Sequence, residues 1–197
     1  MALVSLSALV TGARSGKLVS FPTDTVPALA VRPDRSRDIF TLKQRSPDKP
    51  LILMAARWQE FLSFLDTNHP ALATWQQVAE KYFAGAVTLV LPVSDRGYDL
   101  NQGFKTLGVR IPDSKIAIAI LQQTGAMLTT SANKSNQPPL REMSEINNAF
   151  PSVMTLGDGI SITERSGSGL PSTVVEWTAD GWLVRRQGAV DFDCALH

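Results

Sequence analysis

The sequence has little cysteine and little histidine, and this scarcity excludes several kinds of chemistry. Among 197 residues there are one cysteine, Cys194, and two histidines, His69 and His197. A single cysteine cannot form an internal disulfide, which is typical of proteins from reducing compartments. A histidine-rich zinc site and a Ser-His-Asp triad both lack the residues they need. We therefore expect a cytoplasmic protein that uses neither chemistry.

The sequence also lacks a charge excess and a long apolar run. Lys and Arg total 19 against 18 Asp and Glu, a formal net charge of +1. This balance disfavours binding of polyanions by bulk charge but leaves room for a local basic patch. The apolar N-terminal stretch has no basic residues before it and is interrupted at Arg14 and Lys17, so we expect neither a signal peptide nor a membrane span. The hydrophobic fraction of 44% suits a folded chain of about one domain.

Helix-like and strand-like segments alternate along the chain, which predicts a domain with a mixed, twisted sheet and flanking helices. Amphipathic or capped segments predict helices around residues 3–10, 36–43, 58–65, 70–83, 116–121 and 142–149. Short apolar or β-branched runs predict strands around residues 18–21, 51–54, 87–91, 107–111, 127–130, 153–156, 173–177 and 182–185.

Residues 12–17 (GARSGK) resemble a phosphate-binding P-loop but depart from it twice. The glycines are one residue too close together, and Leu18 stands where a Ser or Thr would hold magnesium. We interpret the segment as a glycine-rich helix exit.

The segment from Arg32 to Lys49 holds six basic and three acidic residues, and three of its cations flank one short loop. Lys43 and Arg45 lie at the end of an expected helix, and Lys49 precedes an expected strand. Cations at a helix C-terminus commonly complement the helix dipole. Three converging cations would also repel one another unless an anion lay between them, so a phosphate site is the competing interpretation.

Short polar motifs follow or open several expected strands. Residues 22–25 (PTDT), 131–133 (SAN) and 172–173 (ST) each suit either a turn or a cleft at strand ends. Arg110 is a charge within an apolar run and therefore needs a carboxylate, from the protein or from a ligand. Residues 185–188 (RRQG) suit a solvated terminus or a functional segment equally well.

Seven motifs occur in order along the chain: FPTDTV, LKQRSPDKPLIL, VTLVLP, LGVRIPD, TTSAN, STVV and VRRQG. Together they resemble the TsaC/YrdC-type threonylcarbamoyl-AMP synthase family, from about Leu3 to Val190. The combination of K-x-R, K-P-L and S-x-N is more specific than any single motif. The resemblance implies a YrdC-like α/β (α+β) fold, with an open, twisted, mixed sheet, flanking helices and a large concave basic cleft. It also implies a single domain over residues 1–190 and a short C-terminal tail over residues 191–197.

The resemblance implies an enzyme that makes L-threonylcarbamoyl-adenylate from L-threonine, bicarbonate and ATP, with release of pyrophosphate. The product would serve the threonylcarbamoyl modification of tRNA adenosine 37 through a downstream tRNA threonylcarbamoyl-transferase machinery. Mg²⁺ is expected to accompany ATP, with no metal ligand among the protein side chains. No membrane contact is expected, and direct contact with tRNA or double-stranded RNA stays an open question.

Family roles fall on ten positions of this sequence. The residues expected to bind ATP are Lys43, Arg45, Lys49, Thr88, Asn133 and Arg186. The residues expected to bind L-threonine are Thr25, Arg110, Ser131 and Ser172. Lys43 and Arg45 are also the expected catalytic residues, because neutralising two anionic reactants is the main catalytic task.

Three departures from the family pattern leave alternatives open. Residues 26–29 read VPAL where the family has V-(Y/F)-G-L, and residues 82–86 read YFAGA near its W-P-G-P. Asp24 replaces the more frequent Glu. One alternative is a non-catalytic RNA-binding or ribosome-associated module with the same basic concavity. The other is an ATP-using paralogue with a different acceptor.

Overall fold

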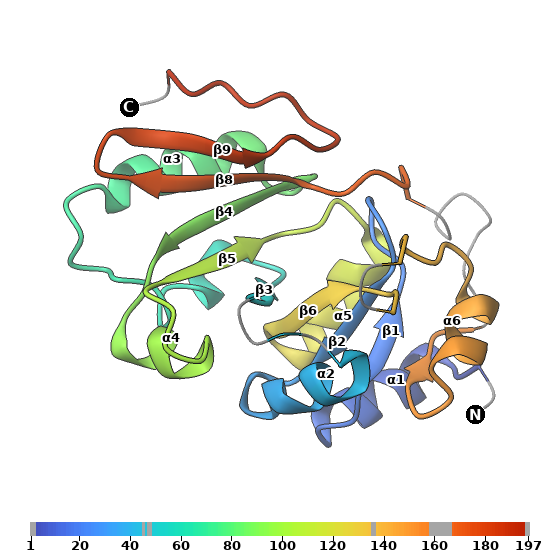
Figure 1. The fold of residues 1–197 in the computed structure, drawn as a ribbon. Helices are drawn as coiled ribbons and strands as arrows, with labels where there is room; N and C mark the ends of the chain where they lie inside the picture. Colours follow the sequence, from blue (N-terminus) through green and yellow to red (C-terminus); the bar gives the residue numbers. More distant parts are fainter. Residues whose placement is uncertain (1–2, 45, 47–48, 135–136, 158–166, 196–197) are drawn as a thin grey trace.

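The computed structural model of the chain describes residues 3–44, 46, 49–134, 137–157 and 167–195. Within these residues nine strands form one open sheet in the order β7-β1-β2-β6-β3-β5-β4-β8-β9 (Figure 1). The strands are β1 (Val19–Phe21), β2 (Ala28–Val31), β3 (Ile52–Met54), β4 (Val87–Pro92), β5 (Thr106–Arg110), β6 (Met127–Ser131), β7 (Met154–Thr155), β8 (Thr173–Thr178) and β9 (Gly181–Arg186). The helices are α1 (Leu6–Arg14), α2 (Ser36–Lys43), α3 (Leu72–Tyr82), α4 (Asp95–Leu100), α5 (Lys115–Thr124) and α6 (Met143–Ala149).

The sheet is mixed, as the alternation of segments predicts. The pairs β1–β7, β3–β5 and β4–β8 are parallel, and the other neighbouring pairs are antiparallel. Helices pack against both faces of the sheet. The predicted fold class is therefore confirmed.

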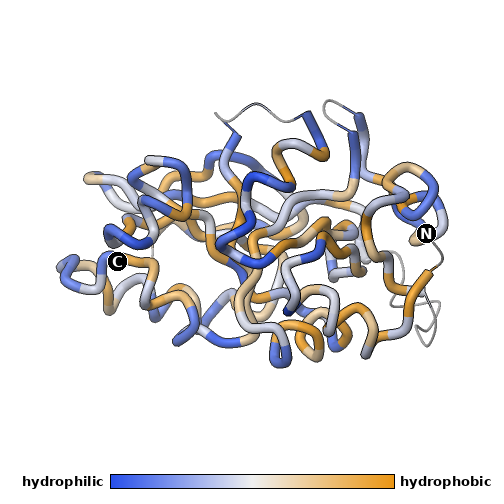
Figure 2. Tube along the Cα trace, turned by 90° about the horizontal axis from the view of Figure 1, so that it is seen from below, coloured by the Kyte–Doolittle hydropathy of each residue, from blue (hydrophilic) through white to orange (hydrophobic). Residues whose placement is uncertain are grey.

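Strand register shows how the two faces of the sheet are covered. Leu53 pairs with Leu128 on one side and Val109 on the other, so these three side chains share a face, and they belong to the core that also contains Ile39 of α2 and Trp75 of α3. Strand residues whose side chains point to the other face of the sheet form a second core with α1 and α5. They are Val19, Phe21, Ala28, Ala30, Met54 and Met127. In Figure 2 hydrophilic stretches mark many of the outer loops, and others cross the middle of the view.

The glycine-rich segment that resembles a P-loop ends a helix. Helix α1 begins after Ser5, whose hydroxyl accepts a hydrogen bond from the Ala8 N–H. Gly16 has φ +85°, a left-handed conformation in which a side chain would be strained. This confirms the interpretation as a helix exit.

The predicted helix over residues 58–65 is wrong. Only a short 3-10 turn, η2 (Trp58–Glu60), forms there, because Phe61, Phe64 and Leu65 enter the core from turns instead of from one helix face. Leu65 also forms an isolated β-bridge with Val93.

Two elements were not predicted. Strand β2 is only four residues long and is buried throughout, so it has no polar–apolar alternation. Helix α4 begins after Ser94, whose hydroxyl caps the Gly97 N–H. Its middle glycine hides the helical signal. A Cβ at Gly97 would lie 2.0 Å from the Phe64 carbonyl oxygen, so close packing requires glycine.

The chain after β9 packs against α3. Phe192 stacks on Tyr82 with ring centroids 4.7 Å apart, and the Asp193 N–H donates to the Tyr82 hydroxyl at 3.0 Å. These contacts fix the segment that follows Arg186. In Figure 1 the two ends of the chain lie on opposite sides of the molecule.

Candidate active site

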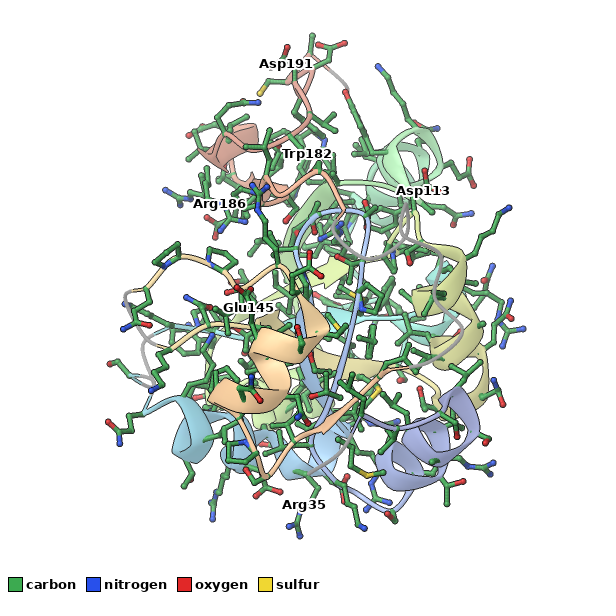
Figure 3. The ribbon with its side chains drawn as sticks, turned by 90° about the vertical axis from the view of Figure 1, so that its right-hand side faces the viewer. Arg35, Asp113, Glu145, Trp182, Arg186 and Asp191 are labelled. Atoms are coloured by element: carbon green, nitrogen blue, oxygen red, sulfur yellow. The ribbon has the colours of Figure 1, made fainter. Side chains whose placement is uncertain are left out.

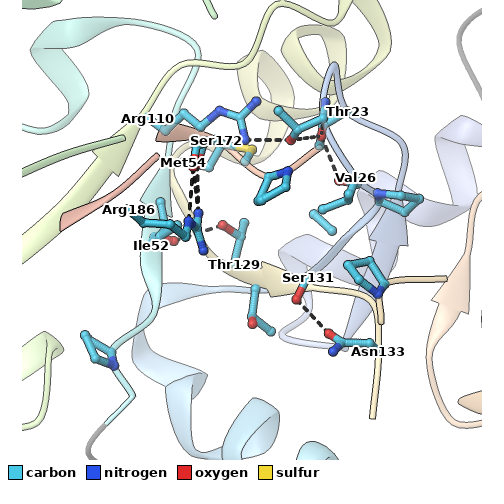
Figure 4. A pocket seen from close by; sticks show the side chains of 17 residues that line it. Thr23, Val26, Ile52, Met54, Arg110, Thr129, Ser131, Asn133, Ser172 and Arg186 are labelled. Atoms are coloured by element: carbon cyan, nitrogen blue, oxygen red, sulfur yellow. Dashed lines mark hydrogen bonds between the residues drawn. The ribbon is translucent and has the colours of Figure 1, made fainter. Parts of the chain in front are cut away.

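A cavity of about 370 Å³ opens where strand ends and loops from distant parts of the chain meet (Figure 4). This volume lies in the range typical of small-molecule sites. Its polar lining consists of hydroxyls, one amide and two guanidinium groups: Thr23, Thr25, Thr129, Thr130, Ser131, Ser172, Asn133, Arg110 and Arg186. Its apolar lining consists of Val26, Pro27, Ala28, Pro50, Ile52, Met54, Pro139 and Pro171.

The loop between β1 and β2 forms one wall through two buried threonines. The Thr23 hydroxyl donates to the Val26 carbonyl at 2.8 Å and accepts from the Thr25 N–H at 3.2 Å. The two threonine hydroxyls are 3.1 Å apart. Since the Thr23 proton goes to Val26, the Thr25 hydroxyl donates to Thr23, and its own lone pairs stay available to other donors.

Arg110, at the end of β5, lies deep in this wall and is only 4% exposed. Its Nη1 donates to the Thr25 hydroxyl at 2.8 Å and its Nη2 to Asp24 Oδ1 at 2.6 Å. Its Nε donates to the Gly85 carbonyl at 3.0 Å. Burial lowers the pKa of Arg110, while the charge of Asp24 and its hydrogen bond raise it, and a guanidinium in this position stays charged near neutral pH. The carboxylate that the sequence requires is thus supplied, in part, by the protein.

Ser172 and Arg186 form the second polar wall, at the β8–β9 side. Arg186 donates from Nη2 to the Ser172 carbonyl at 2.8 Å, and its Nε lies 3.2 Å from the same oxygen. The Ser172 hydroxyl is 2.8 Å from the hydroxyl of Thr88. Thr88 is buried beneath the cavity, so it orients Ser172 without lining the cavity itself.

Arg186 supplies positive charge that no described acidic side chain neutralises. Arg186 still reaches solvent, and its pKa is lowered first by partial burial and then by the charge of Arg110. Within the described residues its contacts are to Ser172, and no ion pair forms there. In the view of Figure 3 Arg186 lies between Trp182 of its own strand and Glu145 of α6. An anion in the cavity would relieve the repulsion between the two guanidinium groups.

The SAN motif closes the cavity at the end of β6. The Ser131 hydroxyl donates to Asn133 Oδ1 at 2.6 Å, and the Asn133 amide donates to the Gln137 carbonyl. Lys43 reaches this motif from the end of α2. Its Nζ is 2.7 Å from the Ser131 carbonyl oxygen and 3.0 Å from Asn133 Oδ1.

The structure places one of the three predicted cations of the α2–β3 segment, Lys43, beside the SAN motif, and the convergence of all three on one loop stays a prediction. Lys43 is 4% exposed and turns toward β6, whereas Lys49 is exposed. Arg45 lies outside the described residues. Hydrogen bonds to the Ser131 carbonyl and Asn133 Oδ1 offset part of the cost of burying the Lys43 charge.

Replacing Lys43 with Met should lower the melting temperature of the empty protein. The change leaves the Ser131 carbonyl and Asn133 Oδ1 without this donor, at a cost of about 1–3 kcal/mol. For a chain of this size that corresponds to about 2–12 °C. Thermal melts without ATP measure it, with Lys49→Met at the exposed position as the matched control. An unchanged or raised melting temperature in Lys43→Met would favour the interpretation by charge repulsion.

The structure adds residues to which the sequence assigned no role. Asp24, noted only as a replacement for Glu, pairs with Arg110. The two stretches that depart from the family pattern lie at this site. Val26, Pro27 and Ala28 line the cavity, and the Gly85 carbonyl accepts a hydrogen bond from Arg110. Proximity of both stretches to Arg110 could not be read from the sequence, because 85 residues separate Thr25 from Arg110.

Comparison with known proteins agrees with this geometry. The model of the Sua5/YciO/YrdC family, described as "Telomere recombination", matches residues 12–188. The chain belongs to this family. Among Sua5/YciO/YrdC relatives, the threonylcarbamoyl-AMP synthase of Mus musculus is 31% identical over an alignment covering 98% of this chain and 68% of that protein. The threonylcarbamoyl-AMP synthase of Photobacterium profundum is 29% identical, over 93% of this chain and 99% of that protein.

A solved Sua5/YciO/YrdC structure shows the same fold. The crystal structure of P. abyssi Sua5 complexed with L-threonine superimposes with a TM-score of 0.82 at 27% identity. The match covers 93% of this chain and 54% of that one, so the chain spans about half the length of the Sua5 protein. The predicted family resemblance is confirmed.

Two further properties bear on function. In the part of the chain that the structure describes, every helix is too short or too polar to cross a membrane. In the same residues, no three His, Cys, Asp or Glu side chains gather into a group that could hold a metal ion.

Proposed function

We propose that the chain is a threonylcarbamoyl-AMP synthase, which makes L-threonylcarbamoyl-adenylate from L-threonine, bicarbonate and ATP and releases pyrophosphate. The observation that carries the proposal is the cavity in which Arg110, Ser172 and Arg186 meet the SAN motif. Support comes from the Photobacterium profundum enzyme, which matches this chain over almost its entire length.

The threonine half of the proposed site is the wall around Arg110. Its guanidinium binds the threonine carboxylate, and the hydroxyls of Thr25, Ser131 and Ser172 provide further hydrogen bonds. The hydrogen bonds from Arg110 to Thr25 and Asp24 support this assignment, because they fix the orientation of the guanidinium within the wall.

The nucleotide half of the proposed site uses the remaining cations and amides. Arg186 and Asn133 line the cavity and would contact ATP directly, while Thr88 acts through Ser172. Lys43, Arg45 and Lys49 belong to the α2–β3 segment and would serve the phosphates. Lys43 contacts Asn133 Oδ1, a neutral oxygen. A phosphate bound there would give Lys43 a charged oxygen partner in place of a neutral one.

The reaction joins two anions, and this chain's task is to align them. The threonine amine attacks the carbon of bicarbonate, and loss of water gives a carbamate. A carbamate oxygen then attacks the α-phosphorus of ATP as pyrophosphate leaves. Guanidinium and ammonium groups neutralise charge on both reactants, and the enclosed cavity holds them in line. The cavity lining offers hydroxyls instead of carboxylates, and the nearby carboxylate of Asp24 is paired with Arg110. Mg²⁺ would therefore be held by the ATP phosphates, whose charge it would neutralise.

The product would supply threonylcarbamoyl groups for tRNA adenosine 37, through a tRNA threonylcarbamoyl-transferase machinery in the cytoplasm. Direct contact with tRNA or double-stranded RNA belongs to the same proposal. The exposed arginines near the start of α2, Arg32 and Arg35, are already paired with Asp34 and Asp38. Binding of RNA there would be weak and sensitive to salt.

Incubation with ATP, Mg²⁺, bicarbonate and L-threonine should give threonylcarbamoyl-adenylate and pyrophosphate in equal amounts, because one molecule of each forms per turnover. Mass spectrometry of the adenylate and a pyrophosphate assay measure them. Withholding bicarbonate or threonine should abolish both products.

The second candidate is an ATP-using paralogue with another acceptor, and the cavity wall of Val26, Pro27 and Ala28 is the observation that favours it. Pyrophosphate release that is indifferent to both threonine and bicarbonate would support this candidate and contradict the synthase. RNA binding that persists in excess ATP and threonine, with no turnover, would support a non-catalytic module.

A further inference from the structure

Within the described residues, the hydrogen bonds of Arg110 use only some of its N–H donors. A guanidinium has five N–H donors. Nε, Nη1 and Nη2 each use one of them, on the Gly85 carbonyl, the Thr25 hydroxyl and Asp24 Oδ1. In the part of the chain that the structure describes, one donor on each terminal nitrogen is left over. Two N–H groups on neighbouring nitrogens can bind a second carboxylate.

The loop that carries Asp24 is fixed by its backbone. The Asp24 carbonyl accepts from the Ser168 N–H and the Thr25 carbonyl from the Gly169 N–H, both at 2.9 Å. Gly167 fits so closely that a Cβ there would lie 2.5 Å from the carbonyl oxygens of Thr23 and Thr25. The Asp24 side chain is 14% exposed, against 5% for Arg110. Asp24 is therefore built into the wall and does not lie in the space that a ligand would enter.

From these contacts we infer that Asp24 is a positioning residue for the threonine site. Its carboxylate holds the Arg110 guanidinium in the orientation that presents the two remaining donors to the carboxylate of the amino-acid substrate. The inference rests on the proposed function and deepens it, since it concerns how the same site selects an α-amino acid. The competing interpretation is that Asp24 occupies the place of the substrate carboxylate and must be displaced.

The two interpretations predict opposite signs for Asp24→Asn. The amide keeps the volume of the side chain and can still accept from Nη2, but it no longer restrains the guanidinium by charge. Removing a negative charge beside the cavity would, by itself, favour an anionic ligand. We nevertheless expect the KM for L-threonine to rise at least tenfold, with the KM for ATP within twofold of wild type. A displaced Asp24 would instead give a lower KM for threonine.

The experiment compares wild type with Asp24→Asn, Asp24→Glu and Asp34→Asn. Steady-state kinetics give KM for each substrate, and titration calorimetry gives L-threonine affinity without turnover. Asp24→Glu keeps the charge and should stay within threefold of wild type. Asp34→Asn removes a carboxylate from an exposed pair with Arg32 and should change neither constant. Thermal melts confirm that each variant is folded.

Each outcome decides the inference. Loss confined to threonine in Asp24→Asn, with recovery in Asp24→Glu, supports it. An unchanged or lowered KM for threonine overturns it. So does an Asp24→Asn chain that does not fold, or one whose threonine and ATP constants rise together, because Asp24 would then be a structural partner of Arg110. A wild-type chain that neither binds threonine nor makes the adenylate shows that the proposed function itself has failed.

Discussion

Replacing Arg110 with Ala should weaken L-threonine binding at least a hundredfold, or about 2.7 kcal/mol, while ATP binding changes little. The side chain supplies the guanidinium for the threonine carboxylate, and among the described residues that wall of the cavity holds no second cation. Calorimetric titration with each ligand measures the difference. Equal losses for threonine and ATP would mean that Arg110 serves the structure and not the ligand.

The same change should also destabilise the empty protein. Asp24 would keep a buried charge without its partner, and breaking such a pair costs about 3–5 kcal/mol. The melting temperature should therefore fall by roughly 6–20 °C. The double variant Asp24→Ala/Arg110→Ala is the control, because it removes the stranded carboxylate. It should recover part of the melting temperature and none of the threonine binding, which separates the two roles of the arginine.

Replacing Arg186 with Ala should weaken ATP binding tenfold to a hundredfold, or about 1.5–3 kcal/mol, since one charge-assisted contact to the nucleotide is lost. Arg186 is exposed and its described contacts are to Ser172, so water can take its place and the melting temperature should move by only a few degrees. ATP titration and thermal melts of the empty protein measure the two effects.

The neighbouring residue provides a matched control for Arg186. Arg185 lies on the same strand and is exposed, but its guanidinium pairs with Glu176. Arg185→Ala should leave ATP affinity unchanged and cost no more than about 1 kcal/mol of stability, as exposed ion pairs do. Equal losses of ATP affinity in both variants would point to a diffuse charge effect at the end of β9, and the specific contact assigned to Arg186 would be wrong.

Local signals predicted the elements that have a strong pattern of their own. The run VTLVLP is strand β4, and the apolar face around Trp75 and Val78 is the buried side of α3. The predicted helix over residues 58–65 failed because the spacing of its apolar residues suits turns as well as a helix. Strand β2 could not be read because it is short and buried on both faces, so its pattern carries no period.

The candidate site was predictable in its residue types but not in its contacts. The charge of Arg110 within an apolar run required a carboxylate, and the sequence left open whether the protein or a ligand would provide it. The structure places Asp24 there. The helix-end position of Lys43 predicted a place in a loop of cations, and the structure adds that its side chain reaches the SAN motif of β6. Such pairings depend on tertiary packing between distant segments, which spacing along the chain does not report.

The cavity is built from segments that are synthesised at different times. Its walls are the β1–β2 loop, near the start of the chain, and Ser172 and Arg186, which enter with the last two strands. During synthesis the two walls therefore come together only after strand β9 has emerged and added to the sheet edge. A ligand that bridges the two walls will favour the sheet that contains β9 over any partly folded form that lacks it.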